Sequence, residues 1–204
     1  MIISKNIQVP QKKYGIHVNA LHSDKILLDK YRDYYKRYIH FNSLTRKFVD
    51  DKYCEIIGTK KHILGVLARG TDYLDCRPKG HPIQPDPCEI INKAKEVMRE
   101  HGYEYLFLAT EDQRIYDLFK IHFGQRLLFS GQKLLSGMKG AKFISQLNSK
   151  EGLNQKQDVL NYLATLHILS RCDAFIGGCT AGTIGAYMMA DGYEYEYFWN
   201  LGCY

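Results

Sequence analysis

The sequence lacks the features that mark several large classes of protein. Its cysteines form no Cys-x-x-Cys pair and no compact disulfide pattern, so we expect reduced thiols that are mostly buried. The chain has no run of about 18 uncharged apolar residues, and its N-terminus shows no apolar stretch followed by a small-residue cleavage site. We therefore expect a soluble, cytoplasmic protein without a transmembrane segment.

Two further absences narrow the classes of ligand. No Asp-x-Asp pair is present and the histidines never fall at ligand spacing, so the sequence predicts neither a metal site nor a cofactor. The formal net charge of +6 arises from Lys and Arg scattered along the chain rather than from a block of like charges. This distribution argues against a nucleic-acid partner and suits a protein that handles phosphorylated ligands.

The hydrophobic pattern predicts an α/β protein. Apolar residues recur with helical spacing at 23–41 and 43–57, which indicates two amphipathic helices. After residue 61, predicted strands alternate with predicted helices, and this alternation favours a Rossmann-like parallel sheet with flanking helices. The predicted strands are 63–68, 105–109 and 127–129, and the predicted helices are 88–101, 112–123 and 158–171. We expect the last of these helices to turn Val159, Leu160, Leu163, Leu166 and Leu169 inward.

These patterns divide the chain into an N-terminal helical segment, 1–60, and a Rossmann-like domain, 61–204. The helical segment is interpreted as a remnant of, or linker from, another domain. A Gly/Ser/Lys-rich stretch at 130–157 has weak periodicity, and we expect a mobile loop with one short helix, close enough to the site to act as a lid. The alternative is that its lysines are only solvated surface charge.

The first candidate site follows the strand at 63–68. Arg69-Gly70-Thr71-Asp72 stands at its carboxyl end, where open parallel sheets place their ligands, and His81-Pro82 comes nine residues after Asp72. An arginine held there by a glycine can offer its planar fork to a phosphate, while Thr71 and Asp72 brace the turn. The alternative is a strand-end turn with a surface salt bridge.

The second candidate site reads as strand, glycine turn and helix over 172–183. Glycines allow close approach to a ligand, and the start of the following helix offers unpaired N–H groups to a phosphate. The segment has neither the ending of a Walker loop nor a spaced Gly-x-Gly-x-x-Gly fingerprint. The alternative is that Gly177 and Gly178 only form a tight turn.

Taken in order, four motifs carry a family resemblance. They are Gly-Val-x-x-Arg-x-Thr-Asp, His-Pro-Ile, Leu-Ala-Thr-Glu-Asp and Leu-Ser-x-Cys-Asp-x-Phe-Ile-Gly-Gly. Over about 64–190 the chain resembles the nucleotide-sugar half of the GDP-fucose-dependent fucosyltransferases, in particular the α1,6-fucosyltransferases and protein O-fucosyltransferases. The resemblance implies the C-terminal half of a GT-B enzyme, which transfers fucose from GDP-fucose to a glycan acceptor by a metal-independent, inverting mechanism. It also implies a missing N-terminal domain or a partner chain.

The resemblance assigns roles to individual residues. It places Arg69, with Gly70 beside it, on the β-phosphate of the donor, and it places Thr110, Glu111 and Asp112 along the donor cleft. The second phosphate-binding turn falls on the residues Gly178, Thr180, Ala181, Gly182 and Thr183. His81 is a candidate donor to the sugar or phosphate, with a structural role as the alternative.

The chain departs from the family at three positions. Thr165 stands at the guanine-reading aspartate, and a hydroxyl cannot accept paired N–H groups as a carboxylate does. Ala181 replaces a phosphate-binding serine, and Arg77 replaces the glutamate base of the α1,6 branch. Because arginine cannot act as a base, Asp75 is our first candidate for proton removal, and Asp72 is the second. A non-catalytic nucleotide-sugar-binding module and a nucleotide-sugar hydrolase are the alternatives to a transferase.

Overall fold

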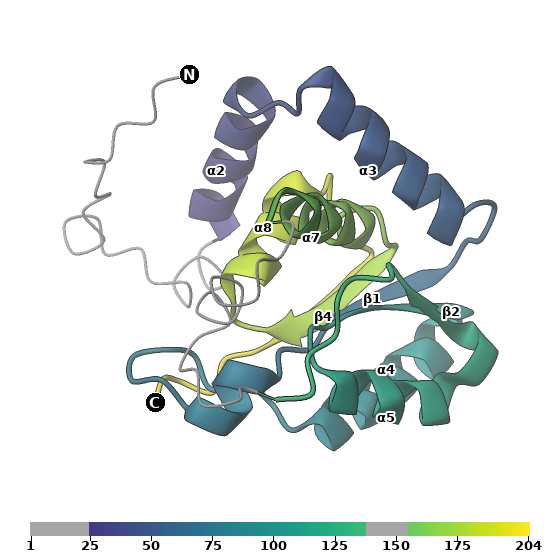
Figure 1. Cartoon of the computed structure of the whole chain (residues 1–204), viewed down its shortest axis with the longest axis vertical. Helices are drawn as coiled ribbons and strands as arrows, with labels where there is room; N and C mark the ends of the chain where they lie inside the picture. Colours follow the sequence, from purple (N-terminus) through teal and green to yellow (C-terminus); the bar gives the residue numbers. More distant parts are fainter. Residues whose placement is uncertain (1–24, 138–154) are drawn as a thin grey trace.

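The computed structural model describes residues 25–137 and 155–204. At its centre is a parallel sheet of five strands in the order β3-β2-β1-β4-β5 (Figure 1). The strands are β1 (Ile63–Leu67), β2 (Tyr105–Ala109), β3 (Leu127–Phe129), β4 (Ala174–Gly178) and β5 (Tyr195–Trp199). Helices cover both faces, so the predicted α/β fold with a Rossmann-like parallel sheet and flanking helices is confirmed.

The helices form three groups around the sheet. The face toward the bottom of Figure 1 is covered by α4 (Pro87–His101) and α5 (Gln113–Phe123), and the opposite face by α7 (Gln155–Leu169) and α8 (Ala181–Met189). The two N-terminal helices, α2 (Lys25–Tyr38) and α3 (Ser43–Ile56), pack outside α8 and α7 respectively. Two short turns complete the described elements: a π-helical turn η1 (Asp72–Cys76) and a 3-10 turn η2 (Gly124–Arg126).

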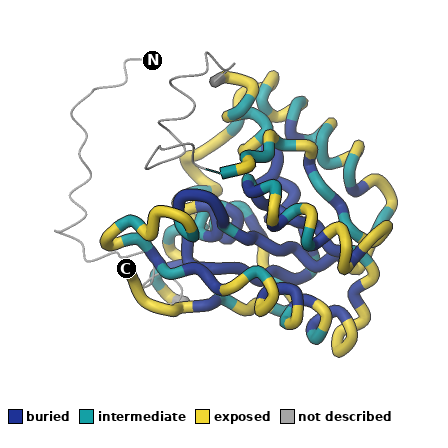
Figure 2. Tube along the Cα trace, turned by 60° about the horizontal axis from the view of Figure 1, so that its bottom comes forward, coloured by how far each residue is buried: buried dark blue, intermediate teal, exposed yellow. Residues whose placement is uncertain are grey.

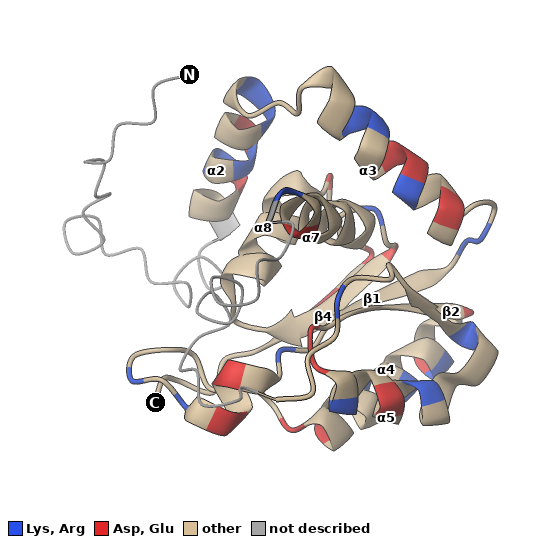
Figure 3. Cartoon of the chain, viewed as in Figure 1, with Lys and Arg blue, Asp and Glu red and all other residues tan. Residues whose placement is uncertain are grey.

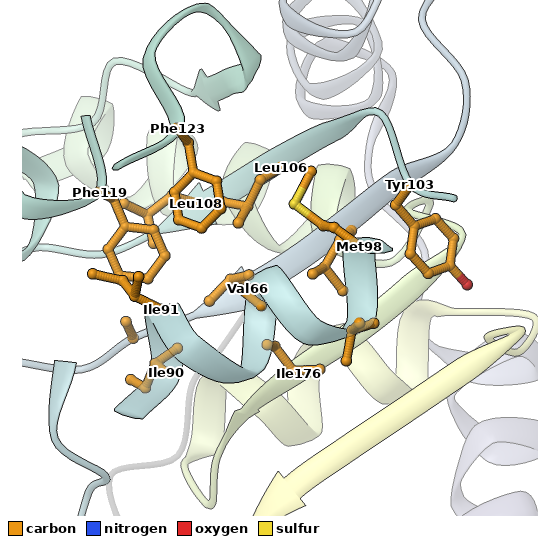
Figure 4. Packing of buried hydrophobic residues seen from close by; sticks show 14 of the residues in the cluster. Val66, Ile90, Ile91, Met98, Tyr103, Leu106, Leu108, Phe119, Phe123 and Ile176 are labelled. Carbon is orange, nitrogen blue, oxygen red and sulfur yellow. The ribbon is translucent and has the colours of Figure 1, made fainter. Parts of the chain in front are cut away.

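Two hydrophobic clusters hold the layers together. The strands β1 and β4 are buried along their whole length, and so is β2 beyond Tyr105, because helices cover them on both sides; dark tube runs through the middle of Figure 2 accordingly. Alternate strand residues such as Val66 and Leu108 pack against Ile91 of α4 and Phe119 of α5 (Figure 4). The intervening residues, such as Phe107, join the second cluster with α7, α8 and the N-terminal helices.

Helix caps fix where the site-bearing elements begin. The side chains of Asp86, Asp112 and Thr180 each accept a main-chain N–H in the first turn of α4, α5 and α8 respectively. Gly102 ends α4 in a left-handed conformation, which glycine adopts without steric cost.

Several expectations need correction. Gly177 and Gly178 lie inside β4 rather than in a turn, and Val159 is 57% exposed rather than inward. Among the six cysteines only Cys172 and Cys179 are buried, and none forms a disulfide. The sequence pattern also missed β5 and η1.

Most of the predicted lid at 130–157 lies outside the described residues. Within the described ranges, no helix combines the length and the apolar character needed to cross a membrane.

Candidate functional site

The candidate site lies where the order of the strands reverses. From β1 the chain continues to β2 and β3 on one side of the sheet, and it then crosses to β4 and β5 on the other side. The neighbouring strands β1 and β4 are therefore followed by connections that lead to opposite sides of the sheet. Open α/β sheets bind ligands in the crevice beyond the carboxyl ends of such strands. A cavity of about 170 Å³ occupies this position. Its lining comes from the ends of β1 and β2, from η1, from the segment after β3, from α7 and from the start of α8: Leu67, Arg69, Tyr73, Ala109, Thr110, Glu111, Gln132, Tyr162, Thr165, Leu166, Thr180, Ala181 and Gly182.

Arg69 is the cation of this cavity, and two carboxylates already contact it. Its Nη2 lies 2.9 Å from Asp72 Oδ1, and its Nη1 lies 3.3 Å from Glu111 Oε2. Burial acts to lower the pKa of the guanidinium, but the charges of Glu111 and Asp72 outweigh it and raise that pKa. The guanidinium also lies over the ring of Tyr73, 4.9 Å from its centroid. The group of Arg69, Asp72 and Glu111 therefore carries one net negative charge.

The loop after β1 is held by carboxylates from the loop after β2. The parallel pairing of Leu67 with Ala109 brings the two loops side by side. Glu111 accepts hydrogen bonds from Gly70 N at 3.0 Å and from Thr71 Oγ1 at 2.9 Å. Thr71 is fully buried and has a φ of 39°, a strained value for a β-branched residue. These contacts offset that strain.

Asp112 joins three elements through one buried carboxylate. Its Oδ2 accepts from Thr71 N at 2.8 Å, its Oδ1 caps α5 through Arg114 N, and the Arg114 guanidinium contacts both oxygens. Burial acts to raise the pKa of Asp112, but the hydrogen bonds from Arg114 and Thr71 lower it below its ordinary value. Arg114 also forms a forked pair with Asp75, with contacts of 3.0 and 3.1 Å. Asp112 is thus a structural anchor of the site.

The opposite wall is the start of α8. Thr180 Oγ1 accepts from Thr183 N at 3.2 Å, and Thr183 Oγ1 donates to Gly178 O at 2.5 Å, so both hydroxyls close the corner between β4 and α8. A Cβ at Gly182 would lie 2.8 Å from Tyr162 Oη, which shows how closely the helix approaches α7. The first turn of α8 therefore faces the cavity with its backbone N–H groups and the positive end of its dipole.

Thr165 forms part of a hydroxyl–amide cluster at the cavity wall. Its Oγ1 lies 2.8 Å from Ser130 Oγ, 2.8 Å from Gln132 Oε1 and 3.0 Å from Asn161 O. The Gln132 side chain in turn donates to Thr110 O. The cluster is neutral, in keeping with the absence of a carboxylate at position 165.

The structure brings most of the predicted residues together. Six of them line the cavity beside Arg69: Thr110, Glu111, Thr165, Thr180, Ala181 and Gly182. Behind the lining, Asp72 contacts Arg69, while Gly70, Asp112, Gly178 and Thr183 support the surrounding loops.

His81 and Asp75 are not among the described lining residues. The main chain of His81 pairs with Pro78 and Tyr204, and its ring lies edge-on to Tyr73 with centroids 5.6 Å apart. Asp75 is held by Arg114.

Besides the apolar lining, sequence reasoning missed four residues of the site that have polar side chains: Tyr73, Gln132, Tyr162 and Arg114. Tyr73 follows Asp72 directly, so its proximity to the site was readable from the motif. Tyr162 lies on α7 four residues before Leu166, which also lines the cavity, so helical spacing from the predicted inward face pointed to it. Arg114 gave no signal, because its role depends on the contact between two loops.

Among residues 25–137 and 155–204, no group of three or more His, Cys, Asp or Glu side chains is placed to hold a metal ion.

Comparison with known proteins gives a likeness in structure alone. No protein-family model and no curated protein matches the sequence. The chain is similar to solved structures of the α-1,6-fucosyltransferase NodZ, the class that the sequence motifs resemble. In the structure soaked with GDP-fucose the identity is 18%, the match covers 76% of this chain and 44% of that one, and the TM-score is 0.46.

Two further NodZ structures give similar values. The structure co-crystallised with GDP shows 15% identity, covers 72% of this chain and 41% of that one, and has a TM-score of 0.44. A structure of NodZ from Bradyrhizobium has the same identity and coverage and a TM-score of 0.43. This chain thus spans less than half the length of the structures that it matches.

Proposed function

We propose that this protein binds a nucleotide sugar, GDP-fucose before others, and serves as the donor-binding half of a metal-independent, inverting glycosyltransferase of the cytoplasm. The observation that carries the proposal is that Arg69 and the first turn of α8 line the same cavity at the strand switch point. A guanidinium and a helix N-terminus are the two groups that stabilise a diphosphate without a metal. The motif resemblance supports fucose as the sugar, whereas Thr165, at the position of the family's guanine-reading aspartate, leaves the base to be identified by experiment.

The chemistry follows from where charge develops. Cleavage of the sugar–phosphate bond leaves negative charge on the departing nucleoside diphosphate, and preorganised donors stabilise that charge. Two of the five N–H donors of Arg69 contact Asp72 and Glu111, which leaves three for a phosphate. Because the group of Arg69, Asp72 and Glu111 is net negative, a diphosphate has to displace or reorient at least one carboxylate. The α8 N-terminus supplies the complementary positive potential.

For the acceptor proton we propose Asp75, with Asp72 as the brace of the turn. Asp75 lies on η1, the same turn as Tyr73 of the cavity lining, and its carboxylate pairs with Arg114. It can accept a proton once that pair opens. Arg77, at the position of the family's base, ends η1 in a left-handed conformation and remains a cation.

Calorimetry with GDP in low-salt buffer tests the proposal. Arg69→Ala is expected to weaken binding by about 1.5 to 3 kcal/mol, because it removes a charge-assisted contact to the diphosphate. Arg37→Ala is the matched control, since Arg37 is exposed on α2 and its guanidinium pairs only with Asp33 among the contacts described. Absence of binding heat for the parent protein, or equal dissociation constants for parent and Arg69→Ala, would overturn the assignment.

A second function, a non-catalytic nucleotide-sugar-binding module, is favoured by one observation. Among the described lining residues Glu111 is the sole carboxylate, and it is already engaged by Arg69, Gly70 and Thr71. Incubation with GDP-fucose separates the functions. Transfer to an added glycan acceptor supports the transferase, release of fucose without acceptor supports a hydrolase, and binding without turnover supports the module.

A further inference from the structure

A second cavity lies near the amino ends of the strands, whereas the donor site lies at their carboxyl ends. The helices run antiparallel to the strands, so the C-terminal ends of α4 and α5 lie beside the amino ends of the strands. Between them is a cavity of about 390 Å³, more than twice the volume of the donor cavity. Its described lining is Lys95, Met98, Arg99, His122, Phe123 and Arg126.

The polar lining of this cavity is entirely basic. Lys95 and Arg99 are four residues apart on one face of α4, a like-charge spacing that destabilises a helix. Lys95 Nζ lies 3.1 Å from His122 Nδ1 of α5, so the ammonium donates to the imidazole. Lys93, on the same helix, pairs with Glu96 at 2.5 Å, whereas no carboxylate of the described residues forms an ion pair with Lys95.

Arg126 is held in place by the main chain. Its Nε donates to Glu104 O at 2.9 Å, and its Nη2 lies 3.4 Å from Tyr103 O and 3.7 Å from Met98 Sδ. These contacts order the guanidinium and leave its Nη1 for another acceptor. A fork that is ordered in advance loses less side-chain entropy when it binds an anion.

Basic residues in a last helical turn also complement the helix dipole, and this accounts for Lys120 and, within the lining, for Arg99 and His122. It does not account for Lys95, which precedes the last turn of α4, or for Arg126 of η2, both of which line the same cavity. Met98 and Phe123, both buried, give that cavity an apolar floor. Basic positions of α4 and α5 appear in blue in Figure 3.

We infer that this cavity binds the phosphate group of a small phosphorylated molecule, with Arg126 as the fixed fork and Lys95 and His122 as donors from α4 and α5. The apolar floor suits the non-ionic part of such a molecule. The site is separate from the proposed donor site, and it requires neither turnover nor a sugar nucleotide.

The test is a titration of the whole chain with inorganic phosphate, followed by the NMR signals of the His122 ring at constant pH and ionic strength. A saturable shift of these signals is expected with phosphate and not with chloride. Lys95→Gln should weaken the response about tenfold, as expected for loss of a charge-assisted contact. Lys120→Gln removes the same charge from the last turn of α5 outside the lining, and it should leave the response unchanged.

Further arms distinguish the sources of the phosphate and the two sites. If the His122 response saturates at a lower concentration of a sugar phosphate than of inorganic phosphate, the apolar floor binds the sugar. If the two concentrations are equal, the site binds free phosphate. Arg69→Ala should leave the His122 response intact even where it abolishes GDP binding. Lack of saturation, an equal response to chloride, or an equal loss in Lys95→Gln and Lys120→Gln would refute the site. Circular dichroism confirms that each variant is folded.

Discussion

Gly70→Ala tests whether the loop after β1 depends on close approach to Asp112. A Cβ built on Gly70 would lie 2.4 Å from Asp112 Oδ2 and 2.5 Å from its Cβ. Asp112 cannot move aside freely, because its carboxylate accepts from Thr71 N and Arg114 N at 2.8 Å each. The overlap therefore has to displace either the loop or the cap of α5.

The expected loss is larger than that of an ordinary surface substitution. Overpacking of a tight site costs about 1 to 3 kcal/mol, and loss of a hydrogen bond to a charged group costs about 1.5 to 3 kcal/mol. If the Thr71 contact breaks, the two effects together lower the free energy of unfolding by about 2.5 to 6 kcal/mol. The displaced loop also carries Arg69, so affinity for GDP should fall in the same variant.

Urea denaturation followed by circular dichroism measures this loss, with Gly102→Ala as the control. Gly102 has a φ of 74°, and a Cβ added there would meet no atom within 4 Å, so its substitution reports backbone strain alone, about 1 to 2 kcal/mol. The steric argument fails if Gly70→Ala is no less stable than Gly102→Ala. An intact GDP affinity in a destabilised Gly70→Ala would show instead that the loop is not coupled to the donor site.

Three further outcomes are expected. Burial, reinforced by Arg171, lowers the pKa of His167 below 6.5 despite its contact with Asp50. As the pH falls below 6.5, the unfolded chain therefore takes up a proton at this histidine before the folded chain does, and the free energy of unfolding decreases. The variant His167→Gln should show a smaller decrease when urea unfolding is measured at a series of pH values. With an acceptor that supports turnover, Asp75→Asn should lower kcat by about 10² to 10⁴ and leave GDP affinity nearly unchanged, and full activity would exclude Asp75 as the base. EDTA should leave GDP binding unaffected in calorimetry, and a requirement for Mg²⁺ or Mn²⁺ would contradict the metal-independent mechanism.

The elements that the sequence predicted well are those whose packing is simplest. β1 and β2 are covered on both faces, so they read as continuous apolar runs. β5 escaped notice because this edge strand keeps Glu196 and Tyr197 exposed. The η1 turn has no hydrophobic period of its own and is fixed by long-range contacts such as that between Asp75 and Arg114.

The same distinction applies to the site. The position of Arg69 followed from local pattern, because the apolar run before it marks the carboxyl end of a buried strand, whereas Glu111 was assigned to the site by the family resemblance. Their direct pairing followed from neither, since it depends on the register of β1 against β2. The glycines of β4 were misplaced for a similar reason. A Cβ at Gly177 would lie 3.0 Å from Leu67 O, a main-chain atom of the neighbouring strand, so the close approach of β1 favours glycine inside β4.

The segment that carries His81 is bound by residues from a distant part of the chain. Gly80 N donates to Tyr204 O, Tyr204 N donates to His81 O, and Ile83 N donates to Gly202 O. These bonds close a loop that spans more than half of the sequence, so the chain loses much entropy before they form. The segment should accordingly order late in folding, after β4 and β5 have joined the sheet, and its amides should exchange with solvent through openings that leave the central strands intact.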